Sequence, residues 1–158
     1  MKVGKLATPR ILRFVTLVLL AGSLLAVSAC SRYSLIESQL KENQQKWSAQ
    51  KIADYNYTLE ISAFAGTLPV IVKVRNGVTQ SVTYLHNGKP ATQEIFNTCN
   101  TVDKLFATIK DAIEQKAHEI TVKYDSTLGY PKRIYIDLVE AVVDEEIEYT
   151  VSDFQVIR

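Results

Sequence analysis

The sequence has few of the residues that carry catalytic and metal-binding chemistry. Its 158 residues include two cysteines, two histidines, one tryptophan and one methionine. His86 and His118 are the only possible imidazole ligands, and their wide separation argues against a zinc site. The chain also lacks Gly-x-Ser-x-Gly, His-Glu-x-x-His and a glycine-rich phosphate loop. It therefore carries none of the common signatures of serine hydrolases, zinc proteases or nucleotide-binding proteins.

A strong excess of charge is missing too, since the formal net charge is +1. This average hides two regions. Residues 1–29 hold four basic and no acidic side chains, whereas residues 30–158 have a formal charge of −3. A mildly acidic domain lacks the basic face that nucleic-acid binding requires, so we expect no nucleic-acid partner. The length suits a single domain and excludes a polytopic membrane protein.

The N-terminus has the order of features of an export signal. Residues 1–13 are basic, and residues 14–25 form an apolar run that is shorter than the roughly 20 residues of a spanning helix. The set that follows resembles the lipobox of bacterial lipoproteins: Val27, Ser28, Ala29 and Cys30. The resemblance implies that residues 1–29 are a cleaved signal peptide and that Cys30 carries covalent lipid. A cleaved signal with an incidental cysteine is the alternative.

Lipidation at Cys30 would hold the chain on a membrane of the cell envelope, because several acyl chains anchor stably where one is marginal. Residues 30–34 leave only a short tether before a single domain over residues 35–158. Ser31 follows the cysteine, and the lack of an acidic residue there resembles default export to the outer membrane in a Gram-negative host. In a Gram-positive host the same signal would place the chain on the outer face of the cell membrane.

Cys99 is the one thiol that remains once Cys30 is modified, so no intramolecular disulfide is expected. A buried, inert thiol is the favoured interpretation. Because Cys99 precedes a predicted helix, whose N-terminus would lower the thiol pKa, a reactive, intermolecular or catalytic thiol stays open.

Hydrophobic patterning predicts an α+β domain in the order α-βββ-α-βββ. Helical spacing predicts helices over residues 35–53, capped by Ser34, and 101–117, capped by Thr101. Alternation predicts strands over residues 54–62, 68–75, 78–85, 119–124, 133–138 and from Ile147 onward. Short connections favour an antiparallel sheet of about six strands with both helices on one face.

Two details of register follow from the same alternation. Around Asn76-Gly77, a three-residue loop with Gly77 left-handed would align the preceding valines with Val78 and Val82, and we prefer it to a two-residue turn. In the last strand the inward parity changes at Ser152-Asp153, which predicts a bulge or an early strand end.

The C-terminal half resembles a family of exported bacterial lipoproteins, domain of unknown function 6174. The resemblance covers about residues 45–155 and rests on five segments in order: Thr101-Val102-Asp103-Lys104-Leu105-Phe106, Val122-Lys123-Tyr124-Asp125, Gly129-Tyr130-Pro131, Ile134-Tyr135-Ile136-Asp137 and Val143-Asp144-Glu145-Glu146-Ile147. Many members carry Cys-Phe-Cys where this chain has Ala63-Phe64-Ala65, so a possible disulfide or metal pair is absent here. The family has no established activity, and the resemblance implies none.

Two segments are candidates for an interaction surface. The first is the turn with Asp125, Gly129, Tyr130 and Pro131, which is either a structural turn or a binding loop presenting Tyr130. Tyr33, Tyr130 and Tyr135 are the tyrosines that we expect at the surface.

The second segment is an acidic cluster: Asp137, Glu140, Asp144, Glu145, Glu146 and Glu148. A solvated sheet edge is the favoured interpretation. A calcium site and a docking patch for a basic partner are the alternatives.

These features favour a non-catalytic envelope lipoprotein that binds an envelope protein or another envelope component through both segments. No cofactor is expected beyond the lipid. A small hydrolase using a carboxylate pair or Cys99 is one alternative. A structural or stress-response lipoprotein without a discrete ligand is the other.

Overall fold

The structure, a computed structural model, describes residues 32–98, 100–140 and 145–158. Its contacts divide the chain into two units, residues 1–36 and 37–158. Within the first unit only residues 32–36 are described, and they are helical. The predictions for Cys30, Cys99 and Asp144 lie outside the described residues.

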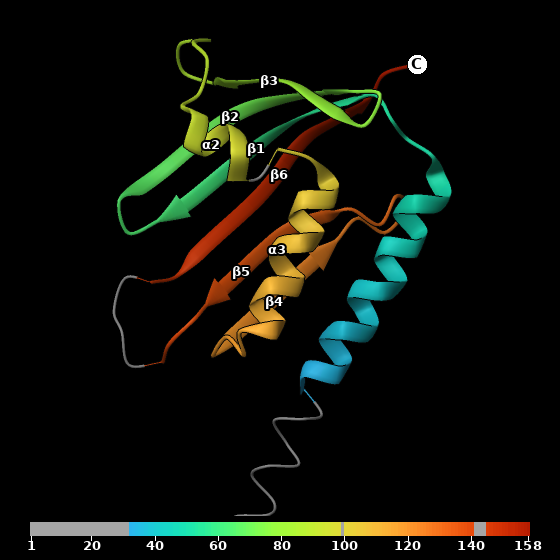
Figure 1. Ribbon diagram of the computed structural model, residues 1–158, viewed down its shortest axis with the longest axis vertical. Coiled ribbons are helices and arrows are strands. Elements are labelled where there is room, and N and C mark those ends of the chain that lie inside the picture. Colours follow the sequence, from blue (N-terminus) through green and yellow to red (C-terminus); the bar gives the residue numbers. More distant parts are fainter. Residues whose placement is uncertain (1–31, 99, 141–144) are drawn as a thin grey trace, which may run out of the picture. The chain divides into compact units, whose positions relative to one another are not determined.

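The second unit is built on one antiparallel sheet of six strands in the order β3-β2-β1-β6-β5-β4 (Figure 1). The strands are β1 (Tyr55–Ala63), β2 (Gly66–Arg75), β3 (Val78–Tyr84), β4 (Glu119–Tyr124), β5 (Pro131–Asp137) and β6 (Ile147–Val156). The first and last strands pair at the centre of the sheet, and the hairpins β2–β3 and β4–β5 flank them. The predicted fold class, an antiparallel six-stranded α+β sheet, and the predicted order of the longer helices and the strands along the chain are confirmed.

Helices cover one face of this sheet. They are an N-terminal helix over residues 37–50 of this unit, a short α2 (Gln93–Thr98) and α3 (Val102–Glu114). Thr101 caps α3 as predicted, because its hydroxyl accepts a hydrogen bond from the Lys104 amide at 3.1 Å. The predicted cap at Ser34 is wrong, since residues 32–34 are already helical. The sequence pattern also gave no sign of α2.

Apolar side chains fill the space between the sheet and the helices. Fully enclosed residues include Val70, Val72, Leu105, Phe106 and Ile109. Each such side chain contributes roughly 1.5–3 kcal/mol to the free energy of unfolding. No buried polar or charged residue occurs in the described part of the chain, so the core on the helix-facing side of the sheet is apolar apart from tyrosine hydroxyls such as that of Tyr55.

The β2–β3 turn corrects one prediction. Asn76 and Gly77 both have positive φ, and Arg75 pairs with Val78, so the connection is a two-residue turn rather than the predicted three-residue loop. Val78 consequently lies on the polar face, 61 % exposed. A register shift one pair later realigns Val72 with Val82, which restores a coherent apolar face by another route.

The irregularity of β6 confirms another prediction. The β1–β6 register shifts between Asn56 and Thr58, opposite Asp153, whose φ is +51°. The bulge turns Phe154 toward the helices, where its ring stacks on those of Tyr55 and Tyr57. None of the helices in the described segments is both long and apolar enough to cross a membrane.

Candidate functional site

The β4–β5 turn is held by its own backbone and by the N-terminal helix. One carboxylate oxygen of Asp125 accepts hydrogen bonds from the amides of Thr127 (3.0 Å) and Leu128 (2.7 Å). The ammonium group of Lys46 donates to the Ser126 carbonyl at 3.1 Å. Gly129 has φ +84°, and a Cβ there would lie 2.8 Å from the Asn43 carbonyl oxygen. These contacts favour the structural interpretation of the turn over the binding loop.

Tyr130 lies in the core, so the expectation that it reaches the surface is wrong. Only 6 % of Tyr130 is exposed, and its ring stacks on Phe154 with centroids 4.2 Å apart. Trp47 of the N-terminal helix meets the same ring edge-on at 6.5 Å. Pro131 is fully buried beside it. The reason is the pairing of Tyr124 with Pro131 and the bulge beside it, which place this end of β5 under the N-terminal helix.

The structure does not bring the two predicted halves of the surface together. The turn that ends at Pro131 precedes β5, whereas Glu145 and Glu146 follow the loop at its other end (Figure 1). Seven residues of strand separate them, which corresponds to about 20 Å. The combined surface is therefore wrong as a single patch, and only its second half stays a candidate.

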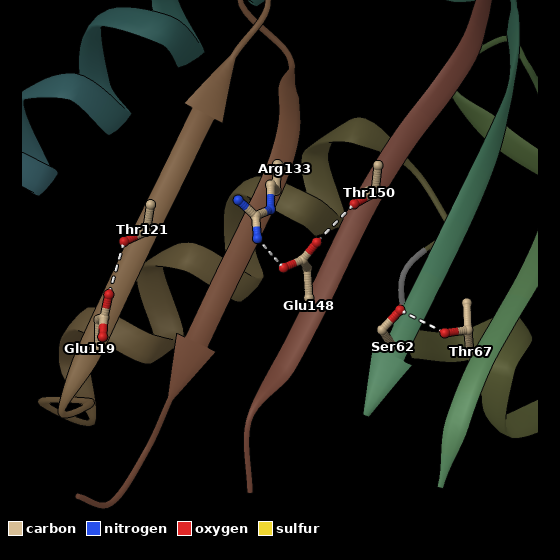
Figure 2. A network of polar contacts seen from close by, with 7 residues as sticks. All are labelled: Ser62, Thr67, Glu119, Thr121, Arg133, Glu148 and Thr150. Carbon is tan, nitrogen blue, oxygen red and sulfur yellow. Dashed lines mark hydrogen bonds and ion pairs between the residues drawn. The ribbon is translucent and has the colours of Figure 1, made fainter. Parts of the chain in front are cut away.

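The uncovered face of the sheet gathers polar side chains from strands that are far apart in sequence. We call the part formed by β4, β5 and β6 the polar-face cluster (Figure 2). Its members come from adjacent register positions of three strands: Glu119, Thr121, Arg133, Tyr135, Glu148 and Thr150. Pro69 and Ile71 of β2 are apolar, half-buried residues of the same face, at some distance along the sheet.

Arg133 and Glu148 form the ion pair at the centre of this cluster, with the guanidinium 2.5 Å from the carboxylate (Figure 2). The hydrogen bond from Arg133 is the main cause that holds the pKa of Glu148 below its usual value. The same bond raises the pKa of Arg133. Thr150 adds a weak hydrogen bond to Glu148 at 3.4 Å. The pair fixes the positions of two charged groups on an otherwise open face.

Tyr135 is the aromatic member of the cluster and is half-exposed. Desolvation raises the pKa of its hydroxyl, and four carboxylates raise it further, those of Glu146, Asp137, Glu119 and Glu148. Beside the ring lies a shallow hollow of about 330 Å³ lined by Glu119, Thr121, Arg133 and Tyr135. Two basic side chains, Arg133 and Lys123, lie on the same face, but the four carboxylates outnumber them, so the surroundings of Tyr135 favour a cationic group over an anionic one.

The described residues of the acidic segment differ in their surroundings. Asp137 accepts a hydrogen bond from the Val139 amide at 3.1 Å, which makes it a turn residue, while Glu145 and Glu146 are exposed. Glu140 lies 3.8 Å from the His118 imidazole. Within residues 32–98, 100–140 and 145–158, no three His, Cys, Asp or Glu side chains converge as metal ligands. Because Asp144 is outside those residues, the calcium alternative stays a prediction.

Sequence reasoning found Tyr135, Asp137 and the glutamates after β5, but missed Glu119, Thr121 and Arg133. The missed residues are the outward positions of strands whose inward positions had been identified correctly. The same alternation contained the signal, because the residues between the inward positions of β4 and β5 face outward and lie opposite one another across the hairpin. Outward polar residues attract little notice because they are normal on a half-solvated sheet.

The arrangement can hold a ligand by charge, hydrogen bonds and ring contact, all from rigid strands. It presents a hydroxyl-bearing ring, a threonine hydroxyl and several carboxylates. Arg133 is engaged by Glu148, which leaves the Glu119 side of the hollow as its acidic rim. No described nucleophile lies in the hollow beside an imidazole base, so the geometry supports binding more directly than covalent catalysis.

Comparison with known proteins gives a family assignment. No curated protein matches the chain. The model of a family of unknown function, DUF6174, matches residues 39–156, which span nearly the whole of the second unit. The chain therefore belongs to the DUF6174 family.

Proposed function

We propose that this chain is a lipid-anchored, non-catalytic binding module of the bacterial cell envelope. In this proposal residues 1–29 are removed, Cys30 carries the lipid, and the following domain stays close to its membrane. The support is the order of basic residues, apolar run, small residues and cysteine in the sequence. Export to the outer membrane of a Gram-negative host, with the domain facing the periplasm, is the location that Ser31 favours.

The polar-face cluster is the proposed binding surface, and the hollow beside Tyr135 is the observation that carries this assignment. The four carboxylates around the ring give this end of the sheet an electronegative surface. A lysine- or arginine-rich segment of an envelope protein has the matching charge. Backbone strands position the groups, so binding would require little reordering of the domain.

The lipid anchor is tested by metabolic labelling with palmitate and by membrane fractionation. We expect the wild-type chain to incorporate label and to sediment with membranes, and Cys30→Ser to lose both properties. Cys99→Ser is the matched control, because it removes the other thiol and leaves the lipidation signal intact. Unlabelled wild-type chain, or label that persists in Cys30→Ser, would contradict the proposal.

The binding surface is tested by titrating the full chain in detergent micelles with a short lysine-rich peptide. NMR shifts are expected at Tyr135 and Glu146, with affinity that falls steeply between low and physiological salt. Glu146→Gln should weaken binding on the order of two- to fivefold, as expected for one exposed charge pair. Glu42→Gln, a matched change at an exposed position of the N-terminal helix, should have little effect. Equal losses in both variants, or shifts confined to the helices, would contradict the assignment.

A further inference from the structure

The two edge strands of the sheet, β3 and β4, differ in how far their outer side is covered by other parts of the chain. Along β3 the chain covers its own edge: Thr83 bridges to Pro90, and the Ala91 amide donates to the Val82 carbonyl at 2.8 Å. The side chain of Thr79 also donates to the Asn100 carbonyl. These contacts occupy backbone and side-chain groups of β3 that would otherwise invite another strand.

Along β4 the described residues provide no such cover. The strand Glu119–Tyr124 ends the sheet and pairs on one side with β5. On its other side it forms no backbone hydrogen bond with any of residues 32–98, 100–140 and 145–158. An edge strand with unpaired N–H and C=O groups is a template for pairing with a further strand.

The sequence of β4 is complementary to itself in an antiparallel register centred on Thr121. In this register Thr121 faces Thr121 of a second copy, and Ile120 faces Val122 of that copy. On the polar face each Glu119 faces Lys123 of the other copy, so both ends of the strand pair carry opposite charges. Opposite charges directly across an antiparallel pair stabilise it, and like charges destabilise it.

The backbone requirement is met by the same register. Alternate residues of a strand direct their N–H and C=O groups to opposite sides, so two edges pair only if outward-directed residues face each other. Ile120 and Val122 belong to one alternating set of residues in β4, and Glu119, Thr121 and Lys123 belong to the other. In this register each residue faces a residue of its own set in the second copy. The residues whose backbone groups point away from β5 therefore face each other.

We propose that β4 is a homodimerisation edge, through which two copies of this chain form one continuous antiparallel sheet about a two-fold axis at Thr121. Glu119 and Lys123 are exposed, and neither forms an ion pair with another described residue. Glu119 accepts a weak hydrogen bond from the Thr121 hydroxyl at 3.3 Å, which leaves its second carboxylate oxygen for the second copy. Ile120 and Val122 would join the two apolar cores along the helix-facing side.

The register is tested by charge reversal with the full chain in detergent micelles, measured by sedimentation. Glu119→Lys alone sets like charges against each other, and so does Lys123→Glu alone. Each variant should raise the dimer dissociation constant on the order of tenfold or more, because two pairs change together. An equimolar mixture of the two variants restores both opposite-charge pairs and should recover the wild-type dissociation constant. The double variant should recover it too.

Cross-linking provides a second test that does not depend on affinity. Thr121→Cys, in a chain whose other thiols are blocked by lipid at Cys30 or by Cys99→Ser, should give a disulfide-linked dimer under mild oxidation. Thr67→Cys, an exposed position on β2 of the same face, should give none. A monomeric wild-type chain at all concentrations, or a mixture that fails to recover the dimer, would overturn the proposal. Loss of lysine-peptide binding alone would not, because that result concerns the proposed function.

Discussion

The two faces of the sheet are made by the same strands yet depend on different interactions. On the helix-covered face the valines of β2 and the aromatic rings around Trp47 are buried, and packing accounts for every one of them. On the open face Arg133, Tyr135 and Glu148 are partly exposed, and the ion pair between Arg133 and Glu148 contributes little to folding. The comparison separates a face on which folding depends from a face whose residues folding leaves largely free to vary.

The largest expected effect is on the covered face. Phe106→Ala removes a fully buried ring that stacks near Tyr124, with centroids 6.3 Å apart. We expect the free energy of unfolding to fall by about 3–5 kcal/mol, from lost burial and the cavity left behind. Denaturant unfolding measures this loss, and a fall below about 1 kcal/mol would show that the helix layer is not the core.

The next effect concerns the turn beneath the N-terminal helix. Gly129→Ala combines an unfavourable positive φ with a Cβ that would lie 2.8 Å from the Asn43 carbonyl oxygen. We expect a loss of about 1–3 kcal/mol in thermal or denaturant unfolding. Gly88→Ala is the matched control, because Gly88 also has positive φ but no atom within 4 Å of the added Cβ. Equal losses of stability in the two variants would show that the contact with the N-terminal helix does not stabilise the turn.

A smaller effect is expected at the hydrogen bond that joins β1 to α3. The hydroxyl of Tyr55 accepts from the Val102 amide at 3.1 Å, and burial raises its pKa to about 12. Tyr55→Phe should cost about 1–2 kcal/mol at neutral pH, because the amide loses its partner. Since the folded-state pKa is raised from 10.0, the tyrosine's contribution is present below pH 10 and falls as pH rises toward 12. The unfolding curve of Tyr55→Phe should lack this alkaline loss, and an unchanged pH profile would contradict the assignment.

The smallest effect on stability is expected on the open face. The pKa of Glu148 is lowered by Arg133, so the pair's contribution is present above the unfolded value of about 4.5 and is lost as pH falls through the lower folded-state pKa. Arg133→Gln should remove this acid-side dependence and change the melting temperature at pH 7 less than Gly129→Ala does, because the pair is partly exposed. A larger change would mean that the open face is structural after all.

Alternation and helical periodicity were sufficient to predict the fold class and the order of its main elements along the chain. They gave the six strands, the two longer helices, the Thr101 cap and the bulge near Asp153, because each depends on residues close together in sequence. The two-residue turn at Asn76-Gly77 was missed because a second irregularity, at Val74, compensates for it one pair later. Local patterns cannot separate one irregularity from two that cancel.

The candidate site was predicted only in part. Tyr135 and Asp137 were identified, whereas Tyr130 was misplaced because its burial depends on Trp47 and Phe154, which are 83 residues before it and 24 after it in the sequence. Arg133 and Glu148 become neighbours only through the β5–β6 register. Such cross-strand relations need the topology of the sheet, which the sequence pattern left open.

The most direct test of the central claim, that the open face is the functional surface, is site-specific photo-cross-linking in native envelopes. A photoreactive residue is placed at Tyr135 on the open face and, as a matched control, at Lys110 on the exposed side of α3. We predict one reproducible adduct from Tyr135 that disappears with Glu146→Lys, and none from Lys110. The same adducts from both positions, or none from Tyr135, would contradict the account.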